Sequence, residues 1–115
     1  MFDKTKKLRA HFYAVSSGRK PVREWILELG KDDRLIVGKD IQKVEFGWPI
    51  GMPSCRPLGG GLYEVRSDLT NCRICRVIFC IVRGEMVLLH GFVKKSQKAP
   101  ASDIELARKR QKEIT

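Results

Sequence analysis

The sequence predicts an α+β domain, in which an antiparallel sheet of about four strands carries two N-terminal helices and one C-terminal helix. Two stretches with helical spacing of apolar residues lie together between residues 21 and 46. Three apolar stretches of strand character follow between residues 62 and 94, and only Arg83 and Gly84 separate the last two. A charged helical stretch comes after Pro100.

Length and charge limit the possible functions. The 115 residues suit a single domain spanning residues 1–115, and 43% hydrophobic with 31% charged residues is a globular composition. The net charge of +10 favours a polyanionic partner: RNA, DNA, an acidic protein or an anionic membrane surface. No apolar run approaches the ~20 residues of a membrane span, and the basic N-terminus lacks the apolar core of a signal peptide. We therefore expect a cytoplasmic protein that does not enter a membrane.

The N-terminal half predicts one strand and two helices. Residues 7–15 alternate between apolar and polar side chains, as a half-buried strand does. Pro21 suits the first turn of a helix that Gly30 closes. A second helix starts near Asp32 or Asp33 and reaches residue 46, although Gly38 weakens it. We expect the first strand to join the sheet and both helices to cover one of its faces.

The second half predicts a long loop, three strands and a helix. Residues 46–61 contain three of the five prolines and five of the ten glycines, so we expect a connecting loop there. Strands are expected at residues 62–66, 72–82 and 85–94. Ser102 is the expected cap of the last helix, whose acidic residues precede its basic ones and so suit the helix dipole.

The four cysteines do not predict a metal site. Cys72 and Cys75 are three apart in an expected strand, so their side chains would point to opposite faces. A structural zinc site also needs a second pair of ligands at a suitable spacing, which Cys55, Cys80 and the two histidines do not supply. We expect reduced cysteines that pack as small hydrophobic side chains, and neither a metal nor another cofactor.

Cations at the ends of the predicted strands are the main functional signal. Lys94 and Lys95 end an apolar strand, and Lys98 follows three residues later. Ammonium groups held side by side favour an anion such as phosphate between them. The alternative is a solvated strand end. Further candidates from the neighbouring segments are Arg56, Arg66, Arg73 and Arg76.

Three of the candidates also have structural interpretations. Arg76 shares a strand face with Ile74 and Ile78, so it could be buried in an ion pair with Glu64 instead of binding phosphate. His90, within an apolar strand, is either a satisfied core residue or a proton-transfer group. Tyr63, beside the glycine turn, could stack on a base or simply pack.

This set of residues suits RNA cleavage without a metal, since carboxylates are few in the strand region and do not form a two-metal site. Such cleavage needs a base for the ribose 2′-hydroxyl, a cation for the pentacoordinate phosphorus and an acid for the departing 5′-oxygen. A lysine among other cations has a depressed pKa and can act as base or acid, while arginine remains charged and stabilises the transition state.

Residues 57–66, 76–79 and 88–100, with residues 21–26 at the first helix, resemble the phage-derived branch of the RelE/HigB toxin superfamily. The resemblance covers about residues 12–110. It implies a compact microbial-RNase-like α+β fold and a type II toxin that cleaves mRNA, often on the ribosome. A co-encoded antitoxin, often with a helix-turn-helix domain, silences such toxins. The tyrosine that some members carry after the last strand is absent, and their lysines before the glycine turn are reduced to Arg56.

By position, the resemblance places Arg76 on an arginine that stabilises the phosphate, and Arg66, Lys94 and Lys95 on the basic groups around it. His90 occupies a position typical of the branch. The sequence-level hypothesis is therefore a metal-independent mRNA endoribonuclease. Its proposed catalytic residues are Arg66, Arg76, Lys94, Lys95 and His90, and its proposed substrate-binding residues are Arg56, Tyr63, Arg73 and Lys98.

Two alternatives to the nuclease hypothesis stay open. The second hypothesis is a non-enzymatic binder, which is either an RNA-binding protein or an inactivated toxin that still binds its antitoxin. A DNA-associated phage protein is the third possibility, although the basic residues of the last helix are too dispersed for a recognition helix.

Overall fold

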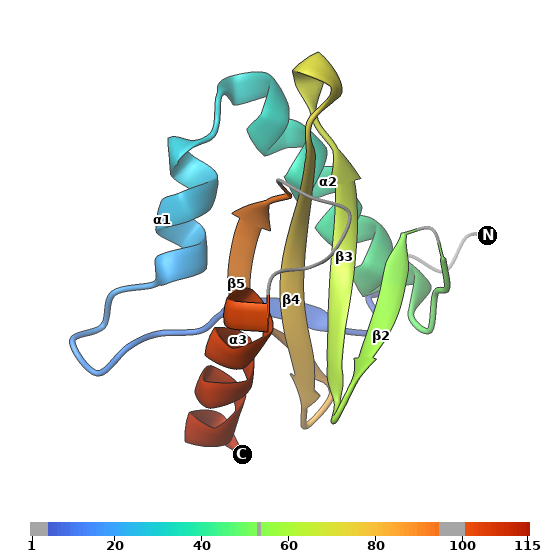
Figure 1. The fold of residues 1–115 in the computed structure, drawn as a ribbon. Coiled ribbons are helices and arrows are strands. Elements are labelled where there is room, and N and C mark those ends of the chain that lie inside the picture. The colour runs from blue at the N-terminus through green and yellow to red at the C-terminus, as the bar shows by residue number, and fades with distance from the viewer. Residues whose placement is uncertain (1–4, 53, 95–100) are drawn as a thin grey trace.

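A five-stranded sheet with helices on both faces forms the fold, in the order β1-β5-β4-β3-β2 (Figure 1). The computed structural model describes residues 5–52, 54–94 and 101–115. Its strands are β1 Arg9–Phe12, β2 Cys55–Gly59, β3 Leu62–Asp68, β4 Ile74–Val82 and β5 Glu85–Val93. Its helices are α1 Pro21–Glu28, α2 Lys31–Gly47 and α3 Ala101–Ile114, with a short 3-10 turn at Thr70–Cys72. The α+β class is confirmed.

The sheet differs from the expected one in two ways. The predicted meander is present, since β3, β4 and β5 pair antiparallel, but β1 pairs with β5 in parallel. Both helices and three strands lie between β1 and β5 in the chain, so no tight turn joins the two and a parallel arrangement is possible. The additional strand is β2, which lies within the residues expected to form a loop and pairs with β3. Its Pro57 is tolerated because β2 lies at the edge of the sheet.

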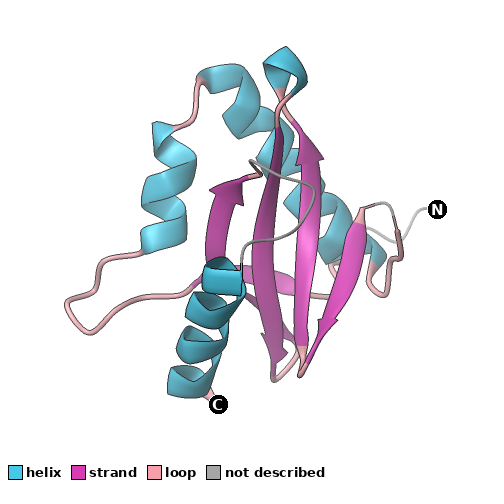
Figure 2. Cartoon of the chain, viewed as in Figure 1, coloured by secondary structure: helices cyan, strands magenta, loops and turns pink. Residues whose placement is uncertain are grey.

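The two faces of the sheet carry different helices (Figure 2). Helices α1 and α2 pack on one face over a core that includes Val37, Val65 and Phe79. Helix α3 packs on the other face, over β4 and β5, with Ala107 against Ile78 and Leu89. Since side chains alternate along a strand, neighbouring residues of one strand face different helices.

Several helices and strands begin or end at other residues than the sequence predicted. Gly30 does not end the first helix but precedes α2 as its N-cap. The strand expected from residue 72 begins at Ile74, because Asn71 and Cys72 have positive φ within the 3-10 turn. Ser102 lies inside α3, which already includes Ala101.

Gly91 allows α1 to approach β5 closely, and replacing it with alanine is expected to destabilise the protein. A β carbon at Gly91 would lie 2.5 Å from two carbons of the Trp25 ring, so the indole would have to move. We expect the free energy of unfolding to fall by about 1–3 kcal/mol, as in other overpacked cores.

Gly38→Ala is the matched control. A β carbon there meets nothing within 4 Å, and Gly38 lies in the interior of α2. This variant should gain up to about 1 kcal/mol from helix propensity. Urea titration of both variants checks the pair, and an unchanged midpoint for Gly91→Ala would show that Trp25 is not held against β5.

Among residues 5–52, 54–94 and 101–115, no helix is both long and apolar enough to cross a membrane.

Candidate functional site

Two arginines lie directly opposite each other on the face of the sheet that carries α3. Arg66 of β3 and Arg76 of β4 are cross-strand partners, so their side chains leave the sheet on the same side. Like charges in directly opposite positions destabilise a sheet unless an anion compensates them. The structure therefore confirms that these two predicted site residues lie together.

Glu64 supplies part of that compensation. It precedes Arg66 by two residues on β3 and pairs across the sheet with Arg56 of β2, so it faces the same side. Its carboxylate is only 2% exposed and forms an ion pair with Arg76, itself 7% exposed. Arg56 approaches the same Oε1 atom at 2.9 Å. The ion pair that was the alternative for Arg76 is present, and it includes a second arginine.

These four residues and Met52 surround a small pocket of about 40 Å³. The guanidinium groups of Arg56 and Arg76 share the buried Glu64 carboxylate there, while Arg66 approaches the exposed Asp68 at 3.3 Å. Three buried atoms in the pocket have no hydrogen-bond partner among the described residues: Arg56 Nε, Arg76 Nε and Glu64 Oε2. Buried polar groups are normally satisfied, so unpartnered donors beside excess positive charge favour an anionic ligand.

Lys94 lies at the edge of this cationic pocket. Its backbone N–H donates to the Ile74 carbonyl at 2.7 Å, which holds it beside the start of β4. Burial lowers the pKa of Lys94, and the positive charges of Arg76, Arg66 and Arg56 lower it further, against an opposing effect of Glu64. Lys94 thus joins the three arginines, as predicted. Lys95 and Lys98 lie outside the described residues.

The lowered pKa of Lys94 should depend on Arg66. Removing that charge with Arg66→Gln is expected to raise the pKa of Lys94, because a repelling cation is lost. The lowered pKa of Lys94 also makes the stability of the protein depend on pH. When Lys94 is protonated, its charge destabilises the folded state, because its pKa is lower there than in the unfolded chain. As the pH rises past the folded pKa, Lys94 loses its proton in the folded state first, so the free energy of unfolding increases. A pH titration of the lysine side chains by NMR checks the shift, with Arg19→Gln as the control. An unchanged Lys94 titration would contradict this electrostatic coupling.

His90 lies on the same face but contacts α3. The register of β4 and β5 shifts between Ile78 and Phe79, so both Leu89 and His90 face α3. His90 Nε2 lies 2.6 Å from Asp103 Oδ1, and its ring stacks on Phe92 with centroids 5.6 Å apart. These contacts favour the satisfied-core interpretation of His90, and its predicted proton-transfer role stays a prediction.

Two residues expected at the RNA site lie on the opposite face. Arg73 forms an ion pair with Asp33 of α2, and the Thr70 N–H and hydroxyl both donate to that carboxylate at 2.9 Å. Thr70 and Arg73 together hold the pKa of Asp33 below its usual value, against burial. Tyr63 stacks on Phe79, its cross-strand partner, with ring centroids 5.5 Å apart. For Tyr63 the reason is the alternation of side chains along β3, where Tyr63 and Arg66 face opposite sides. Arg73 precedes β4 and reaches the α2 face from the end of the 3-10 turn.

Three cysteines are buried as expected, while Cys72 is exposed in the 3-10 turn. Burial raises the pKa of Cys55 to about 11 and that of Cys75 to about 12, so both remain thiols near neutral pH. Within the described residues, no group of three or more His, Cys, Asp or Glu side chains could hold a metal ion.

Sequence reasoning missed β2 and therefore missed that Arg56 shares Glu64 with Arg76. The sequence did contain a signal, because Cys55, Arg56 and Pro57 alternate before the glycine turn. The many prolines and glycines of residues 46–61 favoured a loop instead. Met52, the pocket's apolar edge, had no signal of its own.

A family profile described as phage derived protein Gp49-like (DUF891) matches residues 24–112, more than half of the chain's 115 residues. The chain belongs to this family. The Gp49-like family is associated with the toxins of toxin–antitoxin systems. The matched segment of this Gp49-like chain contains the whole cationic pocket and Lys94. No curated protein matches the chain.

Proposed function

We propose that this Gp49-like protein is the toxin of a type II toxin–antitoxin pair, related to the RelE/HigB superfamily. Its activity would be metal-independent cleavage of mRNA on the ribosome. The observation that carries the proposal is the cationic pocket, where Arg56, Arg66 and Arg76 outnumber Glu64 beside Lys94 with its lowered pKa.

Within this proposal, the half-exposed guanidinium groups of Arg56 and Arg66 bind the scissile phosphate. Arg76 forms the buried positive floor of the pocket. Fixed cations aimed at developing negative charge stabilise a transition state, because they need no reorganisation during the reaction. Lys95, the residue after Lys94, is a further candidate from the sequence and lies outside the described residues.

Neutral Lys94 would accept the proton of the ribose 2′-hydroxyl. The 2′-oxygen then bonds to phosphorus, and the bond from phosphorus to the 5′-oxygen breaks. The Lys94 ammonium returns the proton to that 5′-oxygen, so the products are a 2′,3′-cyclic phosphate and a 5′-hydroxyl. The lowered pKa supports this role, since the neutral amine is then more populated near neutral pH.

The cognate partner in this proposal is an antitoxin, with a helix-turn-helix domain, that silences the toxin in the cytoplasm. The net charge of +10 favours an acidic antitoxin segment as well as RNA.

Primer extension on cellular mRNA after induction tests the proposal. Discrete new 5′ ends are the expected result, and the same cleavage by purified protein should require ribosomes. Growth arrest with unchanged transcripts would overturn the nuclease and favour a non-enzymatic binder.

A further inference from the structure

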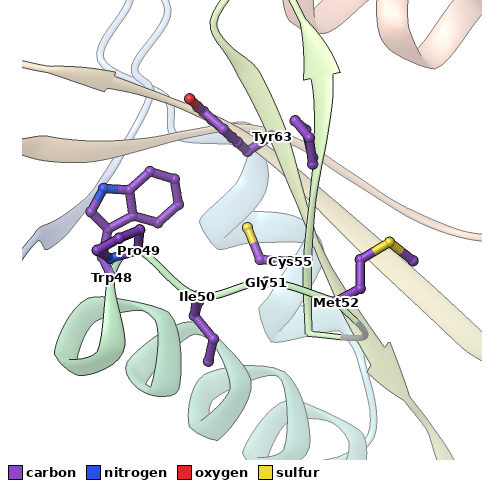
Figure 3. A pocket seen from close by; sticks show the side chains of 8 residues that line it. Trp48, Pro49, Ile50, Gly51, Met52, Cys55 and Tyr63 are labelled. Atoms are coloured by element: carbon purple, nitrogen blue, oxygen red, sulfur yellow. The ribbon is translucent and has the colours of Figure 1, made fainter.

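An apolar pocket on the α2 face lies just across strand β2 from the cationic pocket. It has a volume of about 440 Å³, within the range of small-ligand sites, and its walls include Trp48, Ile50, Cys55 and Tyr63. Figure 3 shows the Trp48 and Tyr63 rings on one side of it, with Cys55 pointing toward them. The two rings meet edge to face, with centroids 5.0 Å apart.

Strand β2 connects the two pockets. Cys55 and Pro57 line the apolar pocket, while Arg56 between them lines the cationic one. Met52 lines both pockets and is 70% exposed, so the surface from one to the other is continuous. Because β2 is the edge strand of the described sheet, none of the described strands blocks an RNA chain that passes around it.

We propose that the apolar pocket holds one unpaired base of the RNA whose phosphate lies in the cationic pocket. This inference rests on the proposed function. The two sides of β2 together suit a nucleotide. One side presents guanidinium groups that can bind a phosphate, and the other presents aromatic rings on which a base can stack. Base stacking on aromatic side chains is the usual way that proteins hold single strands without reading their sequence.

The pocket also explains the position of Tyr63. Its ring faces away from the arginines, so it cannot stack on a base that lies over them. It can contact a base that has turned around the edge of the sheet, together with Trp48, which sequence analysis did not single out.

Fluorescence anisotropy with 2′-O-methyl RNA hexamers tests the inference, because the blocked 2′-oxygen prevents cleavage. One hexamer carries all its bases, and six others each lack one base. With the native protein, loss of the base at one position should weaken binding on the order of tenfold or more, while loss elsewhere has less effect. Equal affinity for all seven hexamers would overturn the proposal.

Two pocket variants sharpen the test. Trp48→Leu should lower affinity for the complete hexamer to that of the weakest abasic one, and should not change binding of the latter. Gly51→Val adds a side chain to the pocket wall where no atom lies within 4 Å of a β carbon, so it serves if Trp48→Leu does not fold. Leu35→Ser, at a 56% exposed leucine of α2, is the control and should leave all affinities unchanged. Retained base dependence in both folded pocket variants would overturn the site.

Arg66→Ala separates this inference from the proposed function. It should weaken binding of all seven hexamers alike and reduce the salt dependence, because it removes a phosphate contact. If Arg66→Ala acts in this way but no abasic position matters, only the base site fails. If Arg66→Ala changes nothing, the proposed RNA site itself fails.

Discussion

Replacing Arg76 with methionine is expected to reduce RNA cleavage on the order of 10²–10³-fold and to relieve growth arrest. The variant removes the buried positive floor of the pocket, and loss of one fixed cation or donor at a transition state has effects of that size. The fold should survive because Arg56 remains 2.9 Å from Glu64 and continues to neutralise it. Methionine also keeps much of the aliphatic volume.

Colony formation after induction, together with primer extension, measures the effect. Arg19→Met is the matched control, since it breaks an exposed Arg19–Glu24 pair of 2.7 Å and does not line the pocket. Arg76→Lys should recover only part of the activity, because a lysine restores the charge without the planar fork. Full toxicity of a folded Arg76→Met protein would remove Arg76 from the catalytic machinery.

Replacing Glu64 with alanine is expected to lower the free energy of unfolding by about 3–5 kcal/mol, the usual effect of removing one partner of a buried ion pair. Arg76 would then lie in the sheet as an uncompensated charge, directly opposite Arg66. Inorganic phosphate should stabilise this variant more than the native protein, since a bound anion replaces the lost carboxylate.

Thermal unfolding with and without phosphate measures both effects. Glu24→Ala is the control, because its exposed pair with Arg19 should contribute less than about 1 kcal/mol and should not respond to phosphate. If Glu64→Ala does not fold, Glu64→Gln keeps the shape of the side chain and allows the same measurement. No gain from phosphate in either Glu64→Gln or native protein would show that the pocket does not bind anions.

Local pattern and strand parity determined much of this protein. Alternation and the Arg83-Gly84 turn predicted the meander of β3, β4 and β5, because hairpins depend on neighbouring residues. The same alternation placed Arg76 in an apolar row and pointed to Glu64 as its partner, which the structure confirms. The end of the last strand correctly placed Lys94 with the arginines.

Only the tertiary structure decided the features that depend on distant pairing. The parallel partner of β1 and the identity of β2 depend on which strand edges are free, and local composition does not contain that information. Register placed Arg66 opposite Arg76. The 3-10 turn before β4 brought Arg73 to Asp33 of α2 on the other face. The pairing of β2 with β3 brought Arg56 to Glu64 and set the apolar pocket beside the cationic one. The sequence thus determined which charges are present, whereas long-range strand pairing determined which of them share a site.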